Sequence, residues 1–461
     1  MILLHAIHDF LPRHRAGSEI YALRLCQALA RRHTVVVLCA EYDPARRHGS
    51  LTWRSFEDLP VVELVNNWRF SSFEETYRSA VLATTLEHVL RAVQPDVLHV
   101  HNLLNLSMEL PRLAKGRSIP TVATLHDFTL VCPSGGQRVH MAEQHVCHQI
   151  DTVRCARCFT ESPFYRQLAF ARVAGHSSRF GAATEVGRKL LRRLPAATRS
   201  VERVVNQAVG HSISSELIDT RLEAARTVFE TIDLFVAPSA ALAADFERFG
   251  LPADKLEVSD YGFTTLPKVP RPESDGRLRI GFVGTLVWHK GVHVLLEAAQ
   301  QLPSHRFEVK LFGDVNTFPD YTATLRALAH GFPVQFMGAF DSEQASEVYA
   351  GIDVLVVSSL WPENSPLVIH EAFMAGVAVV GARQGGIPGL ITHDVNGLLY
   401  DAFSPADLAA ALRTLIDDPE RVARLAAAAP PIKTIEDDAR QWEARYKRVL
   451  HGSVESAGSR T

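Results

Sequence analysis

The stretch DVLVVSSLWPENSPLVIHEAFMAG, residues 353–376, joins an apolar run to a helix-like run and sets the expected architecture. Its apolar part, up to Ser359, is continuous, which is typical of a strand buried on both faces of a parallel sheet. Proline is favoured in a first helical turn because its missing N–H would be unpaired there anyway. We therefore predict a helix that begins near Pro366, with Asn364 or Ser365 as its N-cap.

Two acidic residues flank this predicted helix start. Glu363 lies in the loop after the strand, and Glu371 lies about 7.5 Å along the helix axis at roughly 1.5 Å per residue. The unpaired N–H groups of a helix start favour anions, and carboxylates accept hydrogen bonds from sugar hydroxyls. The pair indicates a site for a sugar that carries phosphate, although a capping glutamate beside a surface glutamate would give the same pattern.

Length and composition narrow the class of protein. At 461 residues the chain is too long for one typical core, so two large domains or three small ones are expected. The chain is 47% hydrophobic and 21% charged, as in ordinary soluble proteins, and its formal net charge of −3 gives no attraction to nucleic acid. No apolar window is long enough to span a bilayer, and the start MILLHAIHDF lacks a basic leader region. These features predict a cytoplasmic protein.

Strand and helix signals alternate in two series. Residues 1–268 contain apolar strand runs that alternate with helix patterns, interrupted at about 160–232 by successive helix-like segments. A linker rich in proline and charge follows at 264–277, and a second series occupies 275–433. The predicted fold class is α/β, with two doubly wound Rossmann-like domains that face a central cleft and a helical insertion in the first.

The end of the chain has a separate prediction. Residues 434–450 are expected to form a helix that packs back on the first domain, and the polar residues 451–461 are expected to be a disordered tail. Within the helical insertion, residues 187–205 are rich in arginine. This basic stretch predicts either a solvated helix face or peripheral contact with the inner face of an anionic membrane.

Several residues near strand ends could take part in chemistry. Lys290 follows a glycine-closed strand and is placed to reach a diphosphate, although a solvated loop lysine is the alternative. Gly17 opens a helix after the first strand, where backbone N–H groups could meet phosphate. His99, His101 and His126 also lie at or near strand ends, either as structural residues or as catalytic ones. The chain has no D-x-D motif, so no divalent ion is expected to be required for catalysis.

Four cysteines gather within a short segment: Cys132, Cys147, Cys155 and Cys158. The last two have C-x-x-C spacing, and the set could supply a closed tetrahedral site for a structural zinc ion. Free buried thiols or a redox pair are the alternatives. Three neighbouring histidines could compete as ligands: His140, His145 and His148.

The chain resembles a known family. Glu363 and Glu371 form the E-x7-E of retaining glycosyltransferases of family 4 (group 1), which have the GT-B fold. The segments PENSPLVIHEAFMAGVAVV, QGGIPGLI, VGTLVWHKGVHVLLEA and AGSEIYALRLCQALA resemble the motifs of that family, and so do DVLHVHN and TLHDF. The resemblance covers most of the chain and is weakest between about 135 and 225.

The resemblance implies a role for each matching residue. Glu371 would bind the ribose of the nucleotide, Glu363 the donor sugar, and Lys290 the diphosphate. His126 would contact the transferred sugar near its anomeric centre, and Gly17 would approach the phosphates. Lys290, Glu363 and His126 would therefore be catalytic. The implied donor-binding residues are Gly17, Thr285, Lys290, Glu363, Asn364, Ser365, Pro366, Leu367, Val368 and Glu371.

One position departs from the family pattern. The family usually has an arginine five residues before the lysine, where this chain has Thr285. A lost charge-assisted contact costs about 1.5–3 kcal/mol, so catalysis is weaker or another group substitutes. Arg383 and His289 are candidates by loop position.

The implied function is transfer of a sugar, with retention of configuration, from a UDP- or GDP-linked donor. The acceptor would be a saccharide, a lipid-linked saccharide or a small molecule, as in polysaccharide biosynthesis. Alternatives are a non-catalytic nucleotide-sugar-binding or scaffold protein, or a nucleotide-sugar 2-epimerase or phosphorylase of the same architecture.

Overall fold

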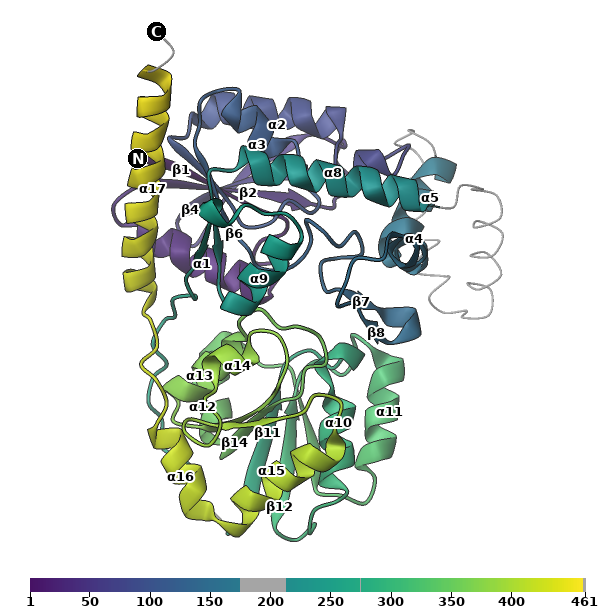
Figure 1. Cartoon of the computed structure of the whole chain (residues 1–461), viewed down its shortest axis with the longest axis vertical. Coiled ribbons are helices and arrows are strands. Elements are labelled where there is room, and N and C mark those ends of the chain that lie inside the picture. Colours follow the sequence, from purple (N-terminus) through teal and green to yellow (C-terminus); the bar gives the residue numbers. More distant parts are fainter. Residues whose placement is uncertain (175–212, 274, 459–461) are drawn as a thin grey trace.

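Two parallel sheets, each covered by helices, stand one above the other in the computed structural model (Figure 1). The structure describes residues 1–174, 213–273 and 275–458. The prediction of two doubly wound α/β domains is confirmed. The basic stretch 187–205, for which membrane contact is predicted, lies outside the described residues.

The first sheet has eight strands in the order β10-β9-β6-β5-β1-β2-β4-β3. Only β3 is antiparallel to its neighbour. Apolar side chains fill both of its faces, which is why its central strands read as continuous hydrophobic runs. The strands are β1 (Ile2–Ile7), β2 (Thr34–Glu41), β3 (Leu51–Phe56), β4 (Leu59–Val65), β5 (Val97–Val100), β6 (Thr121–Thr124), β9 (Leu234–Ala237) and β10 (Leu256–Val258).

The second sheet has six parallel strands in the order β13-β12-β11-β14-β15-β16. Its central strand pairs, β11 with β14 and β14 with β15, bring the ends of two sequence motifs next to each other. The strands are β11 (Leu278–Val283), β12 (Phe307–Phe312), β13 (Val334–Gly338), β14 (Val354–Val357), β15 (Ala378–Ala382) and β16 (Leu398–Tyr400).

Helices cover both sheets. Around the first sheet lie α1 (Gly17–Ala30), α2 (Ala80–Val93), α3 (Leu110–Lys115), α8 (Ser215–Thr231) and α9 (Ala240–Arg248). Around the second lie α10 (Val292–Ala299), α11 (Pro319–Ala329), α12 (Ala345–Ala350), α13 (Leu367–Met374), α14 (Ile387–Leu390), α15 (Pro405–Asp417) and α16 (Pro419–Ala427). Within the described ranges, no helix has the length and apolar character needed to cross a bilayer.

The described parts of the predicted insertion are helical. They comprise the end of α4 (Thr152–Glu161), then α5 (Pro163–Ala174) and α8, and α4 packs against α8. Between β6 and α4 the chain forms a short hairpin, from β7 (Val139–His140) and β8 (His145–Val146).

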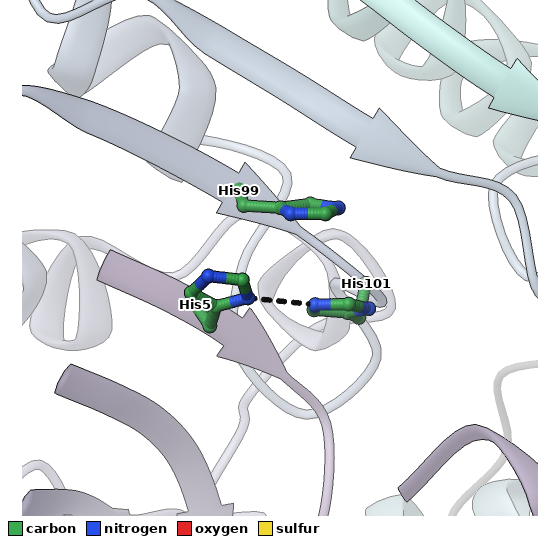
Figure 2. A group of neighbouring side chains, drawn as sticks. All are labelled: His5, His99 and His101. Carbon is green, nitrogen blue, oxygen red and sulfur yellow. Dashed lines mark hydrogen bonds between the residues drawn. The ribbon is translucent and has the colours of Figure 1, made fainter. Parts of the chain in front are cut away.

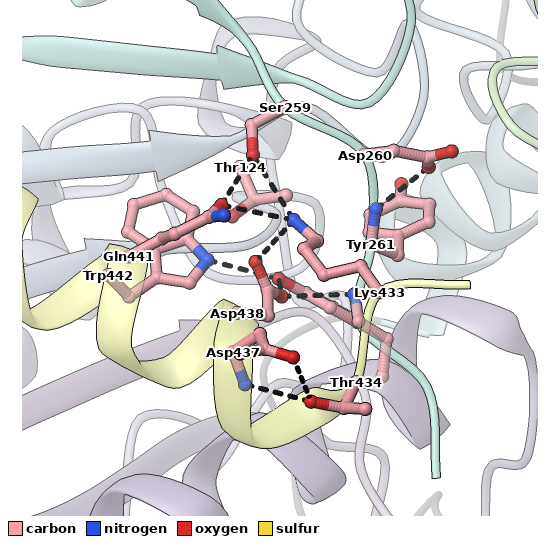
Figure 3. Close-up of polar contacts among 12 residues, drawn as sticks. Thr124, Ser259, Asp260, Tyr261, Lys433, Thr434, Asp437, Asp438, Gln441 and Trp442 are labelled. Atoms are coloured by element: carbon pink, nitrogen blue, oxygen red, sulfur yellow. Dashed lines mark hydrogen bonds and ion pairs between the residues drawn. The ribbon is translucent and has the colours of Figure 1, made fainter. Parts of the chain in front are cut away.

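The last helix, α17 (Ile435–Gly458), returns to the first domain and packs against α1 (Figure 1). It continues past residue 450, so the prediction of a disordered tail from 451 is wrong as far as Gly458. Asp438, which is 1% exposed, accepts hydrogen bonds from Lys433 at 2.8 Å and from Tyr21 at 2.7 Å. The Trp442 indole donates to the Tyr21 hydroxyl at 3.1 Å, and Figure 3 shows Lys433, Asp438 and Trp442 meeting at this junction. Because a buried carboxylate needs a cation and donors, these contacts hold α17 on the first domain.

Candidate functional site

The loops at the carboxyl ends of both sheets meet at the start of α13. The Asn364 amide donates to the carbonyl oxygen of His126, which follows β6. The Ser365 hydroxyl donates to Asp260 at 2.7 Å, and His370 contacts the same carboxylate at 2.8 Å. Ligands of open α/β sheets bind at this edge, so the two domains present their ligand-binding edges to each other.

The start of α13 differs from the prediction. The N-cap is Pro366, which has no side-chain oxygen to accept a hydrogen bond. Asn364 and Ser365 do not cap the helix because their side chains contact the first domain instead. Among the described residues, the amide N–H groups of Leu367 and Val368 have no hydrogen-bond partner. These two donors therefore remain available to an anion.

Lys290 and Glu363 are brought together by the pairing of β11 with β14. The Lys290 ammonium lies 2.6 Å from the Glu363 carboxylate, which also accepts the Ser359 hydroxyl at 2.5 Å. Burial, at 7% exposure, would raise the pKa of Glu363. The Lys290 charge and the hydrogen bonds from Lys290 and Ser359 outweigh burial and hold this pKa below its ordinary value. The carboxylate is therefore ionised at neutral pH.

Glu371 lies further along α13, where its carboxylate accepts the buried Tyr349 hydroxyl of α12 at 2.7 Å. Burial raises the pKa of Glu371, and the hydrogen bond from Tyr349 offsets only part of this rise. The two carboxylates near the start of α13 thus have pKa shifts of opposite sign. The Lys290 ammonium outweighs burial at Glu363, whereas the neighbours of Glu371 do not outweigh burial there.

Gly17 lies where α1 faces α13, close to a side chain of that helix. A Cβ atom at this position would lie 2.9 Å from the Leu367 side chain of the other domain. A second close approach occurs at Gly386, where a Cβ atom would overlap the carbonyl oxygen of Asn364. Gly386 also donates its N–H to the Glu363 carbonyl at 2.6 Å. The QGG turn therefore supports the loop that carries Glu363.

Neither candidate side chain takes the place of the family arginine that is missing at Thr285. Thr285 is exposed at the end of β11. His289 does not substitute as a cation, because burial and the neighbouring Lys290 lower the pKa of this histidine to about 4. The Arg383 guanidinium lies 3.5 Å from Asp401, so it is directed toward β16.

His126 belongs to a chain of hydrogen-bonded rings. Its Nε2 lies 3.0 Å from His101, and its Nδ1 lies 2.9 Å from the Tyr261 hydroxyl. His101 continues the chain to His5, again at 3.0 Å (Figure 2). Burial lowers the pKa of His126 to about 3, so its ring is neutral. Both nitrogens are occupied, and a ring contact to a sugar therefore requires one of these bonds to be exchanged.

His5, His99 and His101 form a compact trio with donor atoms within 4.8 Å of one another (Figure 2). Five of their six ring nitrogens have hydrogen-bond partners. His99 contacts Tyr446 at 2.7 Å and Thr124 at 2.8 Å, His101 contacts two rings, and only Nε2 of His5 has none. A hydrogen-bonded network, rather than ion binding, accounts for this trio.

The four cysteines line a separate cavity, together with Arg138. The histidines that could compete as ligands do not line it.

Three groups that shape the site at the start of α13 were not predicted from the sequence: Ser359, Asp260 and Tyr261. Ser359 lies two residues after β14, at the end of the apolar run that predicts this strand, so the sequence pattern marks its position. The other two follow β10, and no local pattern marks them.

Two family models match the chain. Residues 268–430 match Glycosyl transferases group 1, and residues 15–167 match Glycosyltransferase Family 4. Among curated proteins, the chain is 31% identical over 210 residues to the sulfoquinovosyl transferase SQD2 of Arabidopsis thaliana, an alignment that covers 42% of this chain and 40% of the relative. It is 32% identical over 219 residues to a D-inositol 3-phosphate glycosyltransferase of Xylanimonas cellulosilytica, covering 43% and 52%. The alignments thus span about half the length of these relatives.

Solved structures match along nearly the whole chain. Anabaena Alr3699/HepE in complex with UDP and glucose has a TM-score of 0.58 at 17% identity, with 100% of both chains covered. Sucrose-phosphate synthase from Thermosynechococcus elongatus has a TM-score of 0.62 at 16% identity, with 99% of both covered. The fold is therefore the GT-B fold. The chain belongs to the group 1 (family 4) glycosyltransferases.

Proposed function

We propose that this protein transfers a sugar from a nucleotide-diphosphate sugar to an acceptor with retention of anomeric configuration. The observation that carries the proposal is the Lys290–Glu363 pair, at 2.6 Å, together with the two N–H groups at the start of α13 that have no partner among the described residues. One site thus holds a cation and amide donors for a diphosphate and an ionised carboxylate for sugar hydroxyls. The match to a UDP complex of the same fold supports a nucleotide donor.

The chemistry follows from where charge develops. The bond between the anomeric carbon and the phosphate oxygen breaks through an oxocarbenium-like state, so negative charge builds on the departing diphosphate. Lys290 uses one of its three N–H groups on Glu363, which leaves two for phosphate. The amides of Leu367 and Val368 add further donors. The departing phosphate accepts the proton of the acceptor hydroxyl, which attacks from the same face.

The acceptor is proposed by class only. A saccharide, a lipid-linked saccharide or a small molecule would approach from the first domain, beside the His126 loop. No divalent ion takes part in this scheme, because Lys290 and the α13 amides carry the phosphate charge.

Turnover of a panel of UDP- and GDP-sugars tests the proposal, with transfer or slow hydrolysis as the readout. The anomeric configuration of the product, read by NMR, tests retention. Glu371→Ala should lose donor affinity, because the proposed ribose contact is removed. Absence of turnover in the wild type, or full activity in Glu371→Ala, would refute the proposal.

Thr285 favours a second candidate, a protein that binds a nucleotide sugar without turning it over. This candidate predicts saturable binding, no product, and no gain from Thr285→Arg. If the protein is an enzyme, Thr285→Arg should instead raise kcat by restoring a cation beside the diphosphate. A charge-assisted contact of about 1.5–3 kcal/mol corresponds to roughly 10- to 150-fold. Binding assays with and without turnover separate the two candidates.

A further inference from the structure

The strongest unassigned feature is the cavity lined by the four cysteines, which lies outside the proposed sugar-nucleotide site. Its volume is about 30 Å³, and all four thiols are free and partly buried. We refer to these residues as the four-cysteine cluster: Cys132, Cys147, Cys155 and Cys158.

The cluster is drawn from three pieces of chain: the loop after β6, the end of the short hairpin, and the helix α4. Cys132 follows the loop after β6, Cys147 follows β8, and the C-x-x-C pair lies on one face of α4 because its members are three residues apart. The hairpin between these pieces has only two residues in each strand. Such a segment is the kind that a structural ion stabilises.

A second observation concerns charge. Two buried arginines interact with the cluster. Arg138, at 4% exposure, lines the cavity, and Arg221, at 6%, interacts electrostatically with Cys132 and Cys155. Arg138 shares its carboxylate partner, Asp245, with Arg248, and the Nη2 atom of Arg138 has no hydrogen-bond partner in the part of the chain that the structure describes. A buried guanidinium with this little compensation is costly, because charges taken out of water must be paired.

Arg221 is compensated even less. Its guanidinium donates to the carbonyl oxygens of Thr129, at 2.5 Å, and Leu130, at 2.9 Å. Within the described ranges it forms no salt bridge. Neutral thiols would leave Arg221 without a counter-charge and Arg138 with only its shared partner Asp245. Four thiolates around a divalent ion carry a net charge of −2, which would supply the negative charge that these two guanidinium groups lack.

We propose that the cavity is a closed structural site for one Zn²⁺, held by the thiolates of Cys132, Cys147, Cys155 and Cys158. Binding releases the four thiol protons, because only thiolate sulfur coordinates the ion. At a Zn–S distance of about 2.3 Å, the sulfurs of a tetrahedral site lie about 3.8 Å apart. In the described ranges only the histidine trio has its donor atoms already gathered at metal-binding spacing, so binding of the ion would require the four sulfurs to move closer together.

The site would also support the meeting of the two domains. Val146, adjacent to the ligand Cys147, is 6% exposed and packs into the hydrophobic core of the second domain. Figure 1 shows β7 and β8 on the side of the first domain that faces the second. An ion that fixes this hairpin therefore fixes one contact between the domains, independently of which sugar the protein uses.

Metal analysis of the full chain tests the proposal. Protein expressed with zinc in the medium and purified without chelator should contain about one zinc per chain. Cys158→Ala should lose this zinc, whereas the matched control Cys26→Ala, a buried cysteine of α1, should keep it. Cobalt-substituted wild type should show thiolate-to-metal charge-transfer bands and the intense visible absorption of tetrahedral Co²⁺.

Three results would overturn the proposal. One is wild-type protein without zinc and without a cobalt spectrum. Another is zinc that remains in Cys158→Ala. The third is an intact mass that shows a disulfide within the cluster. The measurements on the wild type decide the question even if the variant does not fold, and none of them depends on transferase activity.

Discussion

Replacement of Lys290 by methionine isolates the charge on which the proposed site depends. The variant keeps a long side chain but removes the ammonium that lies 2.6 Å from Glu363. The carboxylate remains 7% exposed, with the Ser359 hydroxyl as its remaining partner among these contacts. The variant therefore leaves a buried anion without its cation.

The expected loss of stability follows from this burial. Removal of one partner of a fully buried ion pair costs about 3–5 kcal/mol. Because the Lys290 side chain is 26% exposed, water compensates part of this cost. We expect a decrease of about 2 kcal/mol in the free energy of unfolding, roughly 30-fold in the equilibrium constant, by urea denaturation at pH 7.

The decrease should depend on pH, with a definite sign. In the wild type the pKa of Glu363 is lowered, so its stabilising contribution is present above the unfolded pKa and is lost as pH falls through the folded pKa. In Lys290→Met burial is opposed mainly by Ser359, so the pKa of Glu363 should rise above its unfolded value. As pH falls, Glu363 of the variant becomes protonated, and the free-energy cost of burying an unpaired carboxylate is removed. The stability difference should be largest near neutral pH and shrink toward acid pH.

Activity gives an independent readout. Loss of the ammonium from the departing diphosphate should lower kcat/KM by roughly 10- to 150-fold, from about 1.5–3 kcal/mol. Lys310→Met is a matched control, because Lys310 pairs with Glu308 at 2.9 Å on the same sheet, outside the site. A stability difference independent of pH, with kcat/KM within twofold of the wild type, would refute the role given to this charge.

Two further substitutions test other contacts of α13. Tyr349→Phe removes the hydroxyl that donates to Glu371 at 2.7 Å, so the pKa of Glu371 should rise further. Donor KM should rise as pH falls, because protonation removes the carboxylate that is proposed to bind the ribose. This rise should begin at a higher pH in the variant than in the wild type. Gly17→Ala places a Cβ atom 2.9 Å from Leu367, so the domains should close less fully and donor KM should rise several-fold without loss of stability.

Each change has its own control. Parallel profiles of donor KM against pH for Tyr349→Phe and the wild type would contradict the role of that hydroxyl. Gly389→Ala is the control for the glycine, because a Cβ atom at Gly389 meets nothing within 4 Å. An equal change in donor KM for both alanine variants would exclude the contact between Gly17 and α13 as the cause.

The two-domain fold could be predicted because its strands are buried on both faces. A continuous apolar run is a local property, and it identified most strands of both sheets. It missed β4 and the strands at the sheet edges, β3, β10, β13 and β16. Of these edge strands, the first three are largely exposed or half-buried, and β16 has only three residues. Local pattern also placed the end of α17 too early, because its polar residues read as a tail.

The site could be predicted less completely than the fold. Spacing alone placed Glu363 and Glu371 around a helix entry, since a strand, a proline and a helix pattern occur in that order. Spacing could not show that Asn364 and Ser365 bond to the first domain rather than cap α13. It also could not show that both nitrogens of His126 are occupied.

The sequence by itself determined the alternating strands and helices, the family motifs and the acidic pair, because each is encoded by neighbouring residues. Only the tertiary structure decided which groups meet. Lys290 reaches Glu363 across 73 residues, and Asn364 reaches His126 across 238. Such pairs arise when parallel strands align their carboxyl ends and two domains close on each other. No local pattern records that packing, and for this reason the charges and hydrogen bonds of the site became visible only in the folded chain.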